Sequence, residues 1–220
     1  MKTTIRALLL PLLLLSACDR STPQNTPQAK RTGTSTPLHE AAGAGDAIET
    51  AKLLAGGADV NARDRRGRTA LQLAARDGHD AVVTLLLEGG ADAASKNAAL
   101  ALATANGHPG IVAQLLGSGA DVNATTGNGR TALHAAADKG REGIAALLIE
   151  KGADVKIADG SGVTALHSAA AKGQIAIATL LLKAGADLDA KDVSGSSPLA
   201  WARINEQAEM EAFLKQKGAK

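Results

Sequence analysis

The sequence predicts an all-helical solenoid in which short units of two helices stack in chain order. Glycines that close apolar segments recur at steps of 33, 29, 33, 33 and 33 residues, at Gly57, Gly90, Gly119, Gly152, Gly185 and Gly218. A second register advances by the same steps, through Thr36, Thr69, Ala98, Thr131, Thr164 and Ser197. With one Trp, one Phe and no Tyr, the core must consist of alanine and leucine, which favours thin layers. One unit cannot bury its own apolar face, whereas stacked units can.

The unit that starts at Thr131 shows why a first helix is expected. Thr131 is a residue type that caps helix N-termini. Leu133, Ala136 and Ala137 follow at the i, i+3 and i+4 spacing of one helix face. Gly140 then ends the helix and turns the chain.

The second half of the same unit repeats this pattern. Ile144, Leu147 and Leu148 again share one helix face, and Gly152 supplies the left-handed conformation that ends many helices. Residues 154–163 are rich in turn-forming residues and predict a projecting hairpin.

Four of the units can be compared directly. They read TPLHEAAGAGDAIETAKLLAGGADVNARD from Thr36, TALQLAARDGHDAVVTLLLEGGADAASKN from Thr69, TALHAAADKGREGIAALLIEKGADVKIAD from Thr131 and TALHSAAAKGQIAIATLLLKAGADLDAKD from Thr164. This pattern resembles the ankyrin repeat over residues 36–220, with repeats that start near residues 36, 69, 98, 131, 164 and 197. The resemblance implies six helix-turn-helix units with projecting β-hairpin tips. It also implies recognition of a protein partner by the concave face.

The third unit departs from the pattern. It starts at Ala98 with AALALAT and lacks the four-residue tip that precedes other units. The tips of those other units are residues 65–68, 127–130, 160–163 and 193–196. We therefore expect a shortened third tip and a notch in the binding face.

The last unit has features of an end cap. Glu206 stands where other units have the turn glycine, and charged residues follow it. Trp201 is the only aromatic candidate for the binding face. We expect it to pack against the fifth unit and close the stack, because Trp is usually largely buried.

Residues 1–17 predict an export signal. Lys2 and Arg6 precede an apolar segment that is too short to span a bilayer. The segment ends in LSAC, which resembles the lipobox of bacterial lipoproteins and implies that Cys18 is acylated. The alternative is an ordinary secretory signal that contains a cysteine. Residues 18–35 lack large apolar side chains and predict a disordered tether.

These features predict a periplasmic protein that touches the membrane only through its lipid anchor. Asp19 resembles a retention mark for the inner membrane, although other bacteria sort lipoproteins by other rules, so the outer membrane stays open. The chain carries 24 basic and 22 acidic residues, and the signal holds two of the basic ones. The resulting balance gives no field that would attract nucleic acid, and the near absence of aromatics argues against base stacking.

The histidines are expected to be structural. In ankyrin repeats, the residue at the place of His39, His134 and His167 bonds the hairpin backbone. These histidines lie at least a repeat apart, so they cannot share a metal ion. His167 and Ser168 are helix neighbours that do not face each other, so a catalytic pair is not expected. We expect no enzyme activity, no cofactor and no metal.

The candidate partner-binding residues are charged and lie at the tips or just before a turn glycine. They are Arg63, Arg65, Arg66, Arg68, Arg76, Asp77, Arg130, Asp138, Lys139 and Lys172. Arginine forks suit carboxylates and phosphates, so one hypothesis is that the arginines dock an acidic patch on a protein. The alternative is a solvated, solubilising tip.

The sequence therefore favours a non-catalytic, monomeric scaffold that binds a protein. The resemblance is compatible with a helper in stress defence, and equally with an immunity or inhibitor protein that neutralises a toxic effector. A third hypothesis is an envelope spacer without a specific partner.

Overall fold

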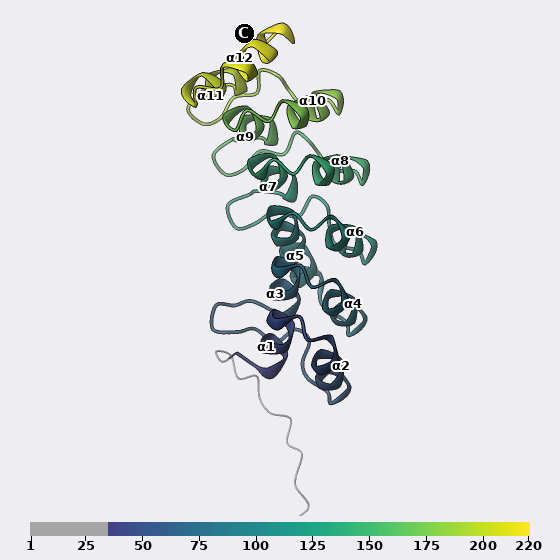
Figure 1. Cartoon of the computed structure of the whole chain (residues 1–220). Helices are drawn as coiled ribbons and strands as arrows, with labels where there is room; N and C mark the ends of the chain where they lie inside the picture. Colours follow the sequence, from purple (N-terminus) through teal and green to yellow (C-terminus); the bar gives the residue numbers. More distant parts are fainter. Residues whose placement is uncertain (1–34) are drawn as a thin grey trace, which may run out of the picture. The chain divides into compact units, whose positions relative to one another are not determined.

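The computed structural model describes residues 35–220. The predicted signal (1–17), the acylated Cys18 and the tether up to residue 34 lie outside the described residues. Within the described part the chain forms twelve helices and no β-strand (Figure 1). They are α1 (Pro37–Ala44), α2 (Ala47–Ala55), α3 (Ala70–Asp77), α4 (Asp80–Glu88), α5 (Ala93–Asn106), α6 (Pro109–Gly117), α7 (Ala132–Lys139), α8 (Glu142–Glu150), α9 (Ala165–Ala171), α10 (Ile175–Lys183), α11 (Pro198–Ile204) and α12 (Ala208–Gln216). None of these helices is long and apolar enough to cross a bilayer.

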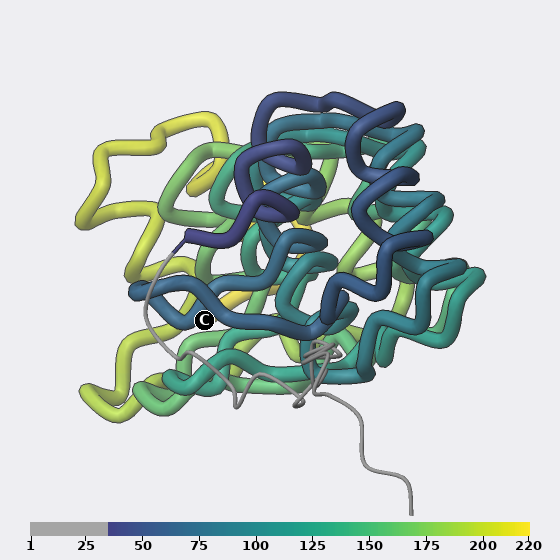
Figure 2. The backbone as a smooth tube through the Cα atoms, turned by 90° about the horizontal axis from the view of Figure 1, so that it is seen from below, coloured from purple at the N-terminus to yellow at the C-terminus, as the bar shows by residue number. Residues whose placement is uncertain are grey.

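The helices form two layers. Each odd-numbered helix packs against the even-numbered helix that follows it and against the next odd-numbered helix. The even-numbered helices from α2 to α10 contact one another in the same order (Figure 1). Seen along the stack, successive helix pairs overlie one another (Figure 2). The predicted all-helical solenoid is therefore confirmed.

The core is a continuous column of leucine and alanine. One leucine from each odd-numbered helix is at most 2% exposed, and these are Leu38, Leu71, Leu100, Leu133, Leu166 and Leu199. The even-numbered helices from α4 onward add Leu86, Leu115, Leu148, Leu181 and Leu214. Each buried leucine recurs at the same steps as the glycines and threonines, so the repeat seen in the sequence is also the repeat of the buried core.

The first helices begin and end as the sequence predicts. Thr131 has extended backbone, and the side chain of His134 returns to its N–H in a capping box. Gly140 ends α7 in the left-handed region, with a φ of 66°. Glu206 occupies the corresponding place after α11. It is the one non-glycine residue with positive φ, 57°, among those described, a conformation that costs a side chain some strain.

Four similar turns lie between helix pairs, and we call them fingers. The first finger is residues 64–68, the second 126–130, the third 159–163 and the fourth 192–196. In each, the first N–H donates to the last carbonyl, as Asp64 does to Arg68 over 2.9 Å. The only strand-like contact in residues 35–220 is a single bridge between Ala158 and Thr164. The predicted β-hairpin tips are thus not confirmed, because the fingers are tight turns.

No finger precedes the third helix pair. Helix α5 begins at Ala93, five residues before the expected start at Ala98, and runs for 14 residues. The Asp92 carboxylate caps it by accepting the Ser95 N–H over 2.6 Å. The interval from Thr69 to Ala98 is four residues shorter than the others, so there is too little chain for a finger. Because Asp92 caps a helix here, residues 93–97 form an added turn of α5 instead.

Leu148→Ala should lower the free energy of unfolding by about 2–5 kcal/mol, because Leu148 is fully buried and its loss leaves a cavity. Urea denaturation of the two proteins measures the difference. As a control, Ile48→Ala on the exposed side of α2 should change stability by about 0.5 kcal/mol or less, since Ile48 is 84% exposed. Equal effects of the two substitutions would contradict the burial pattern.

Candidate protein-binding face

The fingers and the last turns of the odd-numbered helices belong to one surface, which we call the finger face. The Arg130 guanidinium of the second finger binds the Asp138 carboxylate at the end of α7 and reaches Ser168 of α9. At the fourth finger, the Trp201 indole N–H donates to the Asp192 carboxylate over 2.8 Å. Side chains of the fingers and of the last turns of the odd-numbered helices therefore contact one another along the stack.

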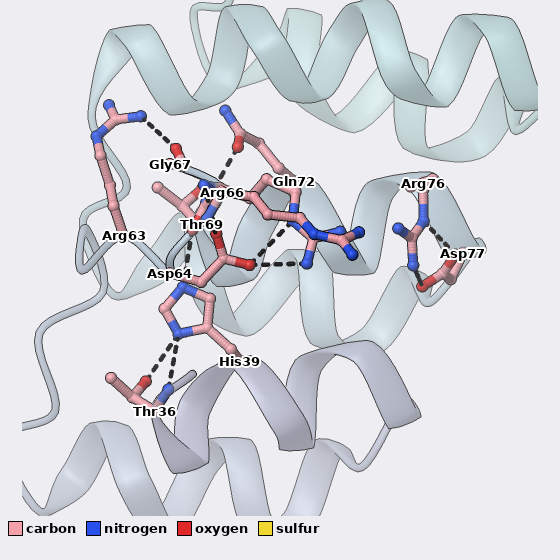
Figure 3. Close-up of polar contacts among 11 residues, drawn as sticks. Thr36, His39, Arg63, Asp64, Arg66, Gly67, Thr69, Gln72, Arg76 and Asp77 are labelled. Carbon is pink, nitrogen blue, oxygen red and sulfur yellow. Dashed lines mark hydrogen bonds and ion pairs between the residues drawn. The ribbon is translucent and has the colours of Figure 1, made fainter. Parts of the chain in front are cut away.

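Three histidines join the start of an odd-numbered helix to the next finger. In His134, Nδ1 accepts the Thr131 N–H over 3.2 Å, so the proton must be on Nε2. Nε2–H donates to the Val163 carbonyl over 2.9 Å. His39 makes the same two contacts, to Thr36 and to the Arg68 carbonyl (Figure 3). His167 repeats them with Thr164 and the Ser196 carbonyl.

The environment keeps two of these rings neutral. Burial lowers the pKa of His134 and of His167, and hydrogen bonds to the finger backbone oppose this only in part. Gln72 occupies the same place in α3, where its Oε1 accepts the Thr69 N–H over 3.0 Å. No finger follows α4, so no finger carbonyl awaits a ring N–H there. The change from His to Gln was a signal of the missing finger that sequence reasoning overlooked.

The first finger is built around Asp64. Its carboxylate accepts the N–H groups of Arg66 and Arg68 and two bonds from the Arg68 guanidinium, at 2.9 and 2.7 Å (Figure 3). The side-chain bonds from Arg68 lower the pKa of Asp64 to about 2, although burial opposes them. Arg68 therefore holds the finger together, and its guanidinium is committed within the chain.

Two further predicted cations are also paired. Arg76 forms two bonds of 2.7 Å with its neighbour Asp77 (Figure 3), and Arg130 is bound to Asp138. Arg63 donates to the Gly67 carbonyl over 3.0 Å.

Besides Asp77, which is paired with Arg76, five predicted site residues are exposed and lie on or beside the finger face. They are Arg63, Arg65, Arg66, Lys139 and Lys172. The structure thus separates the predicted set into pairs that stabilise the fold and side chains that reach solvent. No cluster of metal-ligating side chains is found among residues 35–220.

Comparison with known proteins agrees with this geometry. A family model for ankyrin repeats matches residues 7–97 and 100–192, more than half of the chain. The chain belongs to the ankyrin-repeat family. The first match begins at residue 7, inside the predicted signal. An ankyrin repeat domain from Acinetobacter baumannii AYE, known from a crystal structure, is 35% identical with a TM-score of 0.74. The superposition covers 84% of this chain and 98% of that one.

Curated relatives match over a shorter region. Mitochondrial disaggregases from Bos taurus and Homo sapiens are 54% and 51% identical over 55 residues, a quarter of this chain. That region is 8% of the length of either disaggregase, so their activity as whole proteins does not transfer to this chain.

The ankyrin stack is also fastened by polar contacts away from the fingers. Residues that open even-numbered helices reach back to the preceding pair: His79 bonds the Gly43 carbonyl over 3.2 Å and His108 the Arg76 carbonyl over 3.0 Å. Arg141 makes the equivalent contact, which sequence reasoning missed because its side-chain type differs.

Two asparagines link successive loops in the same way. Asn61 donates to the Gly90 carbonyl and accepts the Asp92 N–H. Asn123 repeats both contacts one finger later, with Gly152 and Asp154. Their signal was the recurrence of Asn after G-A-D-V, which the sequence analysis did not use.

Trp201 lies half-buried at the end of the ankyrin stack. Its ring meets that of His167 edge-on, with centroids 5.8 Å apart. Because its indole N–H is bonded to Asp192, Trp201 fastens the fourth finger to α11. Beside it, Val193 and Ile204 are exposed apolar side chains.

Acidification should destabilise the stack through His134 and His167. Their pKa values in the folded protein lie below the ordinary value of 6.5, so the unfolded chain binds more protons. Stability should therefore fall as the pH drops below about 6.5. A double variant, His134→Gln and His167→Gln, should lose this part of the pH dependence, because Gln72 shows that glutamine can cap the helix. Urea titrations between pH 7.5 and 5 measure the difference.

The three other histidines and all carboxylates are present in both proteins, so they cancel in this comparison. Parallel stability curves for wild type and variant would contradict the assignment of His134 and His167.

Proposed function

We propose that the chain is a stack of six repeat units that recognises a protein partner through the finger face and performs no catalysis. The observation that carries this proposal is a contrast between two registers. The buried leucine register holds the same residue in all odd-numbered helices. The last turn of those helices varies, with Arg76–Asp77, Ala105–Asn106, Asp138–Lys139 and Ala171–Lys172. Exposed side chains that vary on a regular scaffold give the finger face a distinct pattern along the stack, which is what recognition of one partner requires.

The charge of the finger face favours a partner with acidic groups. Arg63 and Arg66 hold exposed guanidinium groups on and beside the first finger, whereas the acidic Asp64 below them is neutralised by Arg68. Guanidinium groups at an interface bind carboxylates in a fixed, two-pronged geometry. The Arg68, Arg76 and Arg130 pairs then act as rigid supports for this surface.

The proposed location rests on the sequence of the N-terminus. Export followed by acylation of Cys18 would place the stack in the periplasm. The inner membrane is favoured by Asp19, and the outer membrane is the alternative. Within this setting we favour a role in stress defence, with an immunity or inhibitor protein as the second candidate. An envelope spacer without a partner is the third.

Site-specific crosslinking in intact cells tests the proposal. A photoreactive amino acid at Lys139 or Lys172, on the finger face, should yield one major product with a single protein. The same group at Ala113 or Ala146, exposed on α6 and α8, should not, because those positions lie in the other helix layer. Mass spectrometry then distinguishes a defence enzyme from a toxin.

A spacer predicts no product from either pair of positions. Equal products from both pairs would mean that the finger face is not the binding surface.

The double variant Arg63→Ala and Arg66→Ala should weaken partner capture and reduce its sensitivity to salt, because it removes two exposed charges. The Asp64–Arg68 pair remains, so the first finger keeps its structure. Yield of the Lys139 crosslink at low and high salt provides the measurement, with Lys183→Ala on α10 as a control for charge alone. Unchanged salt sensitivity would exclude an acidic partner at the first finger.

A further inference from the structure

The last three fingers are joined by a backbone ladder. The Gly160 N–H of the third finger donates to the Asn128 carbonyl of the second over 2.9 Å. The Val193 N–H of the fourth finger donates to the Ser161 carbonyl of the third over the same distance. In each rung, the second residue of one finger bonds the third residue of the finger before it.

The space around the finger glycines shows how closely neighbouring fingers approach one another. A Cβ atom at Gly129 would lie 2.9 Å from the Gly160 nitrogen, and one at Gly162 would lie 3.0 Å from the Asp192 Cα. The first distance is too short for a real Cβ atom and the second is tighter than most such contacts, so the second, third and fourth fingers are in van der Waals contact.

The first finger lacks such a neighbour. Gly67 stands in the register of Gly129 and Gly162, yet a Cβ there would meet no atom within 4 Å. On the other side, Gly127 stands in the register of Gly160, and its Cβ would also meet nothing. Among residues 35–220, no atom therefore fills the place of the missing finger beside Gly67 or beside Gly127.

The ladder is interrupted at the same place. By register, the carbonyl of Arg66 should accept a rung from the missing finger, and the N–H of Gly127 should donate one to it. Within residues 35–220 neither group has a protein partner. Helix α5, which replaces the finger, presents only the exposed methyl groups of Ala93 and Ala94 in its first two positions.

We propose that an acidic turn of the protein partner docks between the first and second fingers and completes the interrupted ladder. The inserted turn accepts the Gly127 N–H and donates to the Arg66 carbonyl. This inference rests on the proposed function, and it specifies where and how the partner binds. A turn fits better than an extended strand, because the fingers that fill the equivalent places are turns. The added backbone rungs resemble strand addition at a sheet edge, in which main-chain bonds supply affinity.

The charges around the opening favour carboxylates. Arg63, Arg65 and Arg66 lie on the first-finger side. The one acidic group at the start of α5 is Asp92, and its pKa is lowered by hydrogen bonds from Ser95 and then by the charges of Arg63 and Lys96. Nearby cations thus stabilise that carboxylate in its charged form, and basic residues outnumber acidic ones over residues 63–68 and 92–96.

Both flanking fingers are fixed before binding. The first is held by the four hydrogen bonds to the Asp64 carboxylate. In the second, Thr126 bonds the Asn128 side chain over 2.5 Å, and Arg130 is tied to Asp138. A partner turn therefore meets two ordered edges, which reduces the entropic cost of binding.

Cyclic peptides test the proposal on the full chain. One peptide carries the turn of residues 158–163 between two glutamates, and its matched control carries the same turn between two lysines. Both are cyclised head to tail and titrated into isotope-labelled protein. The glutamate peptide should shift the Gly127 amide and the Arg66 carbonyl resonances in a saturable way. Its dissociation constant should be about tenfold smaller than that of the lysine peptide, the effect of about 1.4 kcal/mol of charge complementarity.

Two variants locate the site. In the filled variant, a second copy of residues 154–164 replaces residues 92–98, which restores the 33-residue interval and supplies a finger. In the second variant, Gly127→Pro removes the ladder N–H at the second position of a turn, where proline is favoured. Loss of the glutamate-peptide shifts in the filled variant, and binding about tenfold weaker in Gly127→Pro, would support the proposal. An unchanged helical circular dichroism spectrum shows that each variant is folded.

Absence of a saturable shift at Gly127 and Arg66 would overturn the inference, as would equal binding by the filled variant. If the peptides fail while the Lys139 crosslink captures a partner, this inference falls and the proposed function stands. If the peptides bind as expected while crosslinking gives no product, the site stands and the proposed function falls.

Discussion

Close contact between small side chains on neighbouring odd-numbered helices is the constraint on which the rest of the structure depends. Each odd-numbered helix from α3 to α11 has a completely buried alanine in the same register, and these are Ala74, Ala103, Ala136, Ala169 and Ala202. A larger residue there would separate adjacent pairs, and interiors packed to crystal density do not absorb such a change. The finger ladder, the histidine contacts and the asparagine contacts all span that same separation. They form only because the alanines bring the pairs close enough.

The polar contacts use this spacing to orient the finger face. A histidine such as His134 belongs to one helix pair but fixes the backbone of the finger that leads to the next pair. Neutral imidazole suits this double task, since one nitrogen accepts and the other donates. The surface that reads a partner is therefore positioned by buried groups that never touch the partner. Ion pairs such as Asp64 with Arg68 also hold the fingers in place, so not every arginine near the finger face is available to bind a partner.

The repeating part of the fold could be predicted from the sequence, because each buried leucine and each turn glycine recurs at a constant step. The cap at Thr131 and the turn at Gly140 follow from local residue chemistry. The 29-residue interval predicted a shortened third tip, where the structure has no finger at all. The early start of α5 could not be read from the repeat, because it depends on Asp92 acting as a cap where other units continue into a finger. Strand-like tips were expected from the family pattern, yet the fingers close too tightly to form a ladder within themselves. For the candidate site, the charged residue types could be predicted. The ion pairs of Arg68, Arg76 and Arg130 with nearby carboxylates could not, because they depend on side-chain positions that the sequence does not specify.

The added turn of α5 also bears on how the stack responds to mechanical load. Where fingers are consecutive, a backbone rung resists any twist of one helix pair against the next. Between α3 and α7 that restraint is absent, and only helix packing and side-chain contacts oppose rotation. Torsional compliance is thus expected at the junctions of α5 with α3 and with α7, next to a stiff block of three laddered fingers on the C-terminal side. A repeat that is four residues shorter than its neighbours thus leaves the stack freer to twist on either side of α5.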